Sequence, residues 1–131
     1  MIESKKLNLQ ITKNIRVFIS GSAPLLSETH KEFERLTGHK ILERYGMTET
    51  NMNTSNPYDG ERRAGTVGFP LPGIKIRITD TEKNHKMASE KIGMIEIKGE
   101  NVFEGYWKMS DKTKESFTAV SYTHLTLPTK A

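Results

Sequence analysis

Two short apolar runs in the N-terminal part of the chain predict strands. The first run consists of β-branched and aromatic residues, namely Ile15, Val17, Phe18 and Ile19. Consecutive apolar positions of this kind are typical of a strand covered on both faces, as in a parallel sheet. The second run, at Ile41 and Leu42, begins another short strand that leads into Tyr45.

The segment between these runs has the spacing of a helix over about residues 28–37. Three apolar residues share one face of this helix: Leu26, Phe33 and Leu36. Ser27 is the predicted N-cap, and Gly38 fits the position just after the helix. Strand, helix and strand in this order predict a right-handed parallel crossover.

The crossover brings two polar segments to one edge of the sheet. Ser20 to Ala23 follow the carboxyl end of the first predicted strand, and Arg44 to Glu49 follow that of the second. Open α/β sheets bind ligands just outside this edge. We therefore expect the two segments to face one crevice.

Further along the chain, apolar residues alternate with polar ones, which indicates half-buried strands. Isoleucines occupy every second position at Ile74, Ile76 and Ile78, and again at Ile95 and Ile97, where they alternate with Glu96 and Lys98. Residues 65–105 are thus predicted to form an antiparallel β unit. The fold class is α/β: a parallel strand–helix–strand piece followed by this unit.

The connecting segments are predicted mainly from their polarity. Residues 51–63 are interpreted as a loop with a turn at its tip, and residues 80–90 as a polar connection. Ser110 is a candidate N-cap for a short helix running to about residue 117. Residues 1–13 suit the end of a helix, and residues 120–131 are threonine-rich, extended and without functional weight.

Composition narrows the class of protein. The 131 residues suit one domain or part of a larger one, and the 34% hydrophobic fraction supports a modest core. The formal charge of +4 is scattered, so it does not indicate a nucleic-acid partner. The absence of cysteine excludes disulfides and thiolate metal sites. The four histidines lack metal-ligand spacing, and no signal peptide or bilayer-length apolar run is visible, so a cytoplasmic protein without membrane contact is expected.

The stretch from Glu43 to Thr50 carries the clearest candidate chemistry. Tyr45 can stack on a flat ring, and Gly46 lets the backbone approach a ligand closely. The Thr48 hydroxyl can donate to a phosphate oxygen, and Glu49 can hold a hard cation such as magnesium. The same string also suits a polar loop leaving a strand. Phosphate-loop, dinucleotide-binding and nucleophile-elbow motifs are all absent. Arg62 and Arg63 are interpreted as a solvated pair in preference to a contact with phosphate groups.

Five stretches in order resemble the adenylate-forming superfamily of acyl-CoA synthetases, luciferases and adenylation domains. They are Ser20-Gly21-Ser22-Ala23-Pro24-Leu25, Glu43 to Thr50, Gly65 to Gly73, Gly93 to Gly99, and Val102 to Trp107. The resemblance covers about residues 14–118 and implies the large N-terminal domain of such an enzyme. The Glu43 to Tyr58 stretch looks most like malonyl-CoA synthetases. These convert malonate, ATP and CoA into malonyl-CoA, AMP and pyrophosphate through an acyl-adenylate.

The resemblance implies a role for each matching position. Around the nucleotide it places Gly21, Ser22, Ala23, Glu43, Arg44, Tyr45, Gly46 and Thr48. Within that set Tyr45 packs on adenine, Thr48 bonds the α-phosphate, and Glu49 binds the magnesium, so Thr48 and Glu49 are the catalytic pair. The acyl pocket is bordered by Ser20, Arg44, Gly46 and Met47, with Arg44 either holding the distal carboxylate or in a structural ion pair. Tyr106 and Trp107 are assigned to packing.

The chain also departs from the superfamily pattern. The phosphate loop, the ribose-binding aspartate and the catalytic lysine have no counterpart in it. Residues 1–118 are therefore expected to be part of an AMP-binding domain, and residues 119–131 a tail foreign to the family, artefactual or disordered. We expect the isolated chain to be inactive. The alternatives are an adenylating enzyme for another acid, or a fragment that binds no nucleotide.

Overall fold

The computed structural model describes residues 6–80, 92–117 and 123–129. Nearly all of the connection predicted over residues 80–90 lies outside these ranges. The chain divides into two compact units, which are described separately. Unit 1 comprises Met1–Gly46 with Thr54–Phe69, and unit 2 comprises Met47–Asn53 with Pro70–Ala131.

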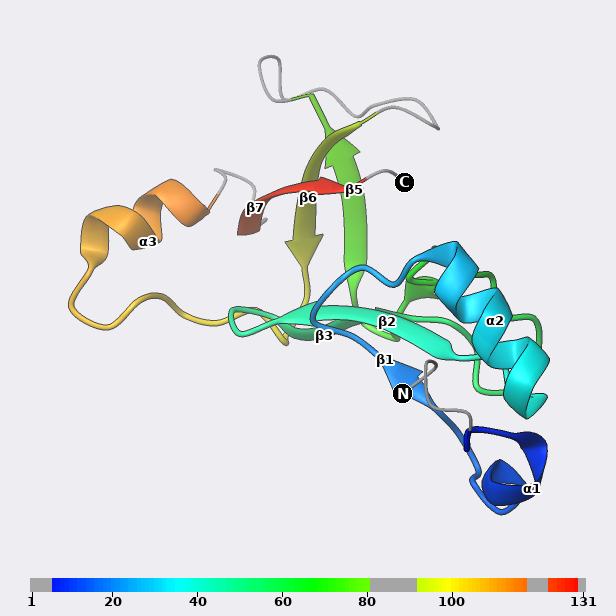
Figure 1. The fold of residues 1–131 in the computed structure, drawn as a ribbon. Helices are drawn as coiled ribbons and strands as arrows, with labels where there is room; N and C mark the ends of the chain where they lie inside the picture. Colours follow the sequence, from blue (N-terminus) through cyan, green and yellow to red (C-terminus); the bar gives the residue numbers. More distant parts are fainter. Residues whose placement is uncertain (1–5, 81–91, 118–122, 130–131) are drawn as a thin grey trace. The chain divides into compact units, whose positions relative to one another are not determined.

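Three helices and seven strands are described (Figure 1). The helices are α1 (Leu9–Thr12), α2 (Ser27–Thr37) and α3 (Ser110–Ser116). The strands are β1 (Ile19–Ser20), β2 (Leu42–Met47), β3 (Asn51–Ser55), β4 (Phe69–Pro70), β5 (Lys75–Thr79), β6 (Gly93–Lys98) and β7 (Thr123–Thr129). The strand order is β1-β2-β3-β4 in one sheet and β5-β6-β7 in the other. Within the described part of the chain, no helix is long and apolar enough to cross a membrane.

The predicted parallel crossover is confirmed in unit 1. β1 pairs with β2 in parallel, with Ile19 opposite Leu42 and Ser20 opposite Glu43. The helix α2 packs its Phe33 into a small core with Leu7 and Ile41. The Phe33 ring meets Phe18 edge-on, at 4.8 Å between ring centroids. Burial of these apolar side chains holds the helix against the strand pair.

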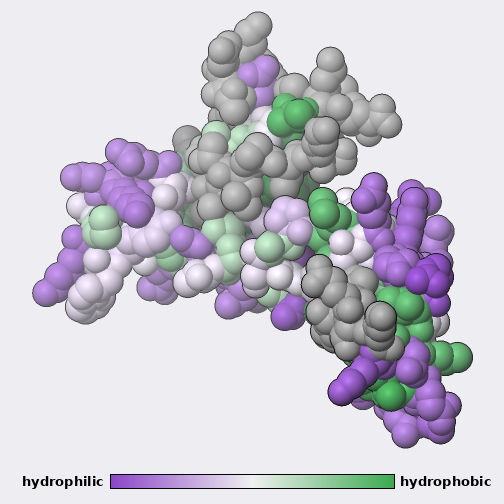
Figure 2. Space-filling view, in the orientation of Figure 1, coloured by the Kyte–Doolittle hydropathy of each residue, from purple (hydrophilic) through white to green (hydrophobic). Residues whose placement is uncertain are grey.

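The first strand is shorter and more exposed than predicted. It contains two residues, and Ile15 and Ile19 remain 41% and 54% exposed. Among the described strands, β1 lies at the end of the strand order and pairs with β2 alone. Apolar surface accordingly stays open beside the helices of unit 1 (Figure 2).

The helix α2 also differs from its prediction at the N-terminus. Leu26 takes the N-cap position without a side-chain bond and is 70% exposed, so it does not share the buried face. Ser27 is the first helical residue, and its hydroxyl lies against Gly65. The helix ends as predicted at Gly38, whose φ of 72° is left-handed. Its buried face instead includes His30, at 2% exposure.

The predicted loop over residues 51–63 is wrong for residues 51–55, which form β3. Asparagine and threonine favour turns because their side chains bond to nearby backbone. Here the structure supplies other partners. Asn53 is fully buried, and its side-chain oxygen accepts a hydrogen bond at 3.1 Å from the amide of Asn101, which is 48 residues away. Long-range pairing therefore overrides the local preference.

The predicted antiparallel unit is confirmed in unit 2. β5 and β6 pair with Ile76 opposite Ile97 and Ile78 opposite Ile95, and Figure 1 shows them as a long ribbon. Residues 123–129 add β7, antiparallel to β6. The family boundary at residue 118 stays a prediction.

Two details of unit 2 correct the prediction. Glu96 does not face solvent but is fully buried, where it pairs with Arg77 and accepts a hydrogen bond from Thr79 at 3.1 Å. A buried carboxylate is tolerated because these partners compensate for the lost water. Ser110 is not an N-cap: Met109 takes that position without a side-chain bond, and Ser110 begins α3.

Candidate functional site

The Glu43 to Thr50 stretch forms a strand end and a turn. Glu43 to Met47 continue β2, so they do not follow the strand as predicted. The turn comprises Thr48, Glu49 and Thr50, and the Thr50 N–H closes it by donating to the Met47 carbonyl at 3.2 Å. The division between the compact units falls after Gly46, so the two halves of the stretch are described by themselves.

In unit 1, the predicted approach of the two polar segments is confirmed for their first residues. Ser20 pairs with Glu43, and a Cβ on Gly21 would stand 3.4 Å from Arg44 Cγ. Gly21, Ser22 and Ala23 are exposed, with Ser22 at a φ of 69°. Ser22 thus holds a left-handed conformation that non-glycine residues seldom adopt. Such exposed backbone can bond a ligand directly.

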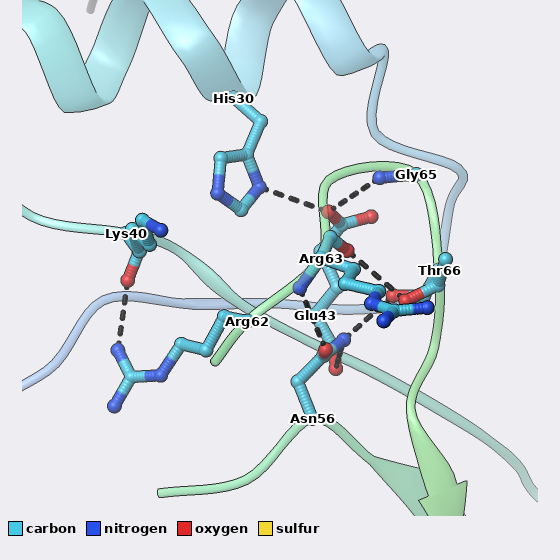
Figure 3. Close-up of polar contacts among 8 residues, drawn as sticks. All are labelled: His30, Lys40, Glu43, Asn56, Arg62, Arg63, Gly65 and Thr66. Atoms are coloured by element: carbon cyan, nitrogen blue, oxygen red, sulfur yellow. Dashed lines mark hydrogen bonds and ion pairs between the residues drawn. The ribbon is translucent and has the colours of Figure 1, made fainter. Parts of the chain in front are cut away.

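Glu43 is buried inside unit 1 and holds three elements together (Figure 3). Its Oε1 lies 2.9 Å from His30 Nδ1 of α2 and accepts from the Gly65 N–H at 3.0 Å. The Glu43 side chain is 7% exposed, which assigns it to anchoring.

Asn56 ties the loop after β3 to the same point of the chain. Its side-chain amide donates to the Glu43 carbonyl at 3.1 Å and to the Thr66 carbonyl at 2.6 Å. Its Oδ1 accepts from the Arg63 N–H at 3.1 Å (Figure 3). The sequence interpretation missed Asn56, although it directly follows the polar strand that was taken for a loop.

Arg62 is half-buried and binds the backbone of its own unit. Its guanidinium donates to three backbone carbonyls, those of Lys40, Pro57 and Tyr58, at 2.6–3.1 Å. Figure 3 shows it reaching toward Lys40. The interpretation as a solvated pair missed these bonds, in which three convergent carbonyls accept from the planar guanidinium of Arg62.

The remaining predicted residues of unit 1 differ in exposure. Arg44 is exposed, while Ser20, Tyr45 and Gly46 are half-buried. Across residues 6–80, 92–117 and 123–129, the ion pairs do not include Arg44. Both interpretations of Arg44, as the partner of a distal carboxylate and as part of a structural ion pair, stay predictions.

In unit 2, the turn presents its two candidate side chains differently. Thr48 is exposed, and Met47 and Glu49 are half-buried. The Glu49 carbonyl accepts from the Phe103 N–H at 2.8 Å, and the Thr50 carbonyl accepts from the Asn101 amide. The same amide donates to Asn53 Oδ1 at 3.1 Å. The turn is thus fixed by a segment distant in sequence.

Tyr106 contributes more than the packing assigned to it. Its hydroxyl donates to Glu49 Oε1 at 2.8 Å. The Glu49 carboxylate raises the pKa of the Tyr106 phenol, mainly through this bond and further through burial and charge. The phenol therefore stays protonated and remains a donor at neutral pH. In the sequence, Tyr106 is marked only by the Val102 to Trp107 motif, which does not indicate that its hydroxyl bonds to Glu49.

The donor set at Glu49 limits how a metal ion could bind. Among the described residues, no group of three His, Asp or Glu side chains could hold an ion. Magnesium commonly binds through one or two carboxylates together with substrate phosphates and water. With one oxygen bonded to Tyr106, Glu49 fits this type of site and does not fit a cage made of protein ligands alone.

The chain resembles known enzymes along most of its length. A family model described as AMP-binding enzyme matches residues 2–107. A malonate–CoA ligase of Arabidopsis thaliana is 43% identical over 110 residues, which cover 84% of this chain and 17% of that protein. A mitochondrial malonate–CoA ligase of Bos taurus is 37% identical over 82% of this chain and 22% of its own length. The chain thus spans about a fifth of the length of these curated relatives.

Solved structures agree with this similarity. ATP-bound MatB from Rhodopseudomonas palustris superposes with a TM-score of 0.91 at 54% identity, over 94% of this chain and 24% of that one. A benzoate CoA ligase from Burkholderia xenovorans superposes with a TM-score of 0.83 at 28% identity, over 95% and 25%. The mixed fold seen here is thus also the fold of these ligases.

Proposed function

The chain belongs to the AMP-binding enzyme family, and from this premise we propose that it is a segment of an ATP-dependent acid–CoA ligase. The observation that carries the proposal is the geometry of the turn after β2. It exposes the Thr48 hydroxyl and fixes the Glu49 carboxylate by a hydrogen bond. A fixed anion beside an exposed donor suits a nucleotide phosphate with its magnesium ion.

We assign the remaining contacts by the same reasoning. The exposed backbone at Gly21, Ser22 and Ala23 borders the adenine, and Tyr45 packs on its ring. The backbone at Glu43, Arg44 and Gly46 lines the nucleotide pocket, while the Glu43 side chain stays in its buried cluster. Thr48 donates to the α-phosphate, and Glu49 holds the magnesium that neutralises phosphate charge when bound.

The proposed reaction has two steps. The carboxylate of the acid attacks the α-phosphate of ATP, forming an acyl-adenylate as pyrophosphate leaves. The thiol of CoA then attacks the acyl carbon, and AMP leaves. Donors fixed around a phosphate before the attack stabilise the charge that develops there, which is the expected contribution of Thr48. We expect the 131-residue chain alone not to turn over, because it covers only part of such an enzyme.

Glu49→Gln in the full-length ligase that carries this segment tests the assignment. The amide keeps the size of the side chain but removes its charge, so we expect acid-dependent pyrophosphate exchange to fall about a hundredfold. Glu100→Gln is the matched control, because Glu100 is an exposed glutamate in the same unit. Equal rates for the two variants would contradict the proposed role of Glu49.

We propose malonate as the acid, on the strength of the named relatives and of one exposed cation. A dicarboxylate needs a partner for its distal charge, because burying that charge unpaired is costly. In the proposed assignment, the exposed Arg44 supplies that cation. The alternative acids are fatty and aryl carboxylates.

Arg44→Met tests this choice against a panel of malonate, benzoate and a medium-chain fatty acid. A charge-assisted hydrogen bond contributes about 1.5–3 kcal/mol, so kcat/KM for malonate should fall at least tenfold. The values for the two monocarboxylates should change little. A uniform loss across the panel would show that Arg44 does not bind the distal carboxylate.

A further inference from the structure

The segment from Asn101 to Tyr106 holds the turn that carries Glu49. Within unit 2, it contributes a backbone N–H to the Glu49 carbonyl, an amide to the Thr50 carbonyl and a hydroxyl to the Glu49 carboxylate. The first two bonds fix the path of the backbone. The third, from Tyr106, fixes the direction of the carboxylate.

Tyr106 is itself held from three sides. Its N–H donates to the Thr113 hydroxyl of α3 at 2.9 Å, and its ring meets Phe103 edge-on at 4.8 Å between centroids. Lys112 Nζ lies 4.9 Å from the ring centre. A Cβ on Gly105 would stand 2.6 Å from Thr113 Cγ2, so glycine is needed for this approach. A donor placed this firmly can orient its acceptor.

We propose that Tyr106 is a positioning residue for the cation site: its hydroxyl orients the Glu49 carboxylate and thereby sets the affinity of the ligase for magnesium. This inference rests on the proposed function, because it takes Glu49 as the ligand. The hydrogen bond occupies Oε1 and leaves Oε2 for a cation. Partners of this kind typically change metal affinity by 10- to 100-fold when they are removed.

Tyr106→Phe removes the hydroxyl and keeps the ring with its contacts to Phe103 and Lys112. In the full-length ligase, the KM for free magnesium should rise about tenfold, while kcat at saturating magnesium should stay unchanged. Calorimetric titration with ATP should show the magnesium dependence of ATP binding shifted to higher magnesium concentrations by a similar factor. Tyr58→Phe is the matched control, because Tyr58 is 51% exposed and lies in unit 1.

A double-mutant cycle with Glu49→Gln separates this inference from the proposed function. If Tyr106 acts through Glu49, Tyr106→Phe should change nothing further in the Glu49→Gln background. An equal shift in both backgrounds would overturn the inference and leave the role of Glu49 intact. If Glu49→Gln alone leaves the magnesium dependence unchanged, the proposed function fails first.

Thermal unfolding of each variant distinguishes orientation from a general loss of structure. We expect Tyr106→Phe to retain the wild-type unfolding midpoint within a few degrees. Thr113→Val offers a second route, because it releases the Tyr106 backbone and keeps the hydroxyl. It should raise the KM for magnesium in the same direction, and an unchanged KM for both variants would refute the positioning role.

Discussion

Gly68→Ala is expected to destabilise the fold by about 3 kcal/mol or more, through combined strain and overlap. Gly68 has a φ of 77°, where a side chain is strained. Its added Cβ would stand 2.1 Å from the Ser55 carbonyl oxygen and 2.3 Å from the Asn56 nitrogen. Both are backbone atoms next to the Asn56 bonds, so neither can rotate away. Urea unfolding followed by circular dichroism measures the loss.

Gly73→Ala is the matched control for this prediction. Gly73 has a nearly identical φ of 81°, but a Cβ there would meet nothing within 4 Å. It therefore reports the backbone strain alone, about 1–2 kcal/mol. If the two variants lost equal stability, the contact with Ser55 and Asn56 would not matter, and the tight approach at Gly68 would be refuted.

His30→Ala is expected to cost about 3 kcal/mol or more, because it leaves the buried Glu43 carboxylate without its imidazole hydrogen-bond partner and opens a cavity. Glu43 would retain the Gly65 N–H, but its side chain is only 7% exposed, so water cannot replace the imidazole fully. Chemical denaturation gives the change in the free energy of unfolding.

Two further variants isolate the charge in this prediction. His39→Ala is the control, because its Nε2 lies 3.1 Å from a neutral carbonyl, that of Thr12, and should cost about 1 kcal/mol for that bond. Adding Glu43→Gln to His30→Ala removes the unpaired charge and should recover part of the loss. A double variant less stable than His30→Ala alone would show that the cost comes from the lost packing of the ring.

The sequence predicted well where one face of an element is apolar and the other polar. The alternation at Ile76 and Ile97 placed both strands of the antiparallel pair, because period two is specific to a half-buried strand. The same rule failed at Glu96. Its burial depends on Arg77, which stands directly opposite in the strand register. The pattern of apolar and polar residues along one strand does not reveal which residue lies opposite on the neighbouring strand.

The candidate site shows the same limit. The local string of Tyr45, Gly46, Thr48 and Glu49 indicated nucleotide chemistry, because it places suitable functional groups next to one another, but it also suited a polar loop. The residues that hold these side chains in place by hydrogen bonds are distant in the sequence. Tyr106 is 57 residues from Glu49, and His30 was overlooked because a polar residue on an apolar helix face carries no signal of its own.

The alternation of β2 has a consequence for altering acid selectivity. Glu43 points toward α2 and carries the buried bonds of unit 1, whereas the next residue, Arg44, is exposed beside Gly21. Neighbouring positions of one strand thus separate the anchoring by Glu43 from the acid recognition that we propose for Arg44. Residue 44 can vary without disturbing the cluster around residue 43, so a ligase of this type could acquire a new acid by exchanging one solvent-facing side chain while its framework stays intact.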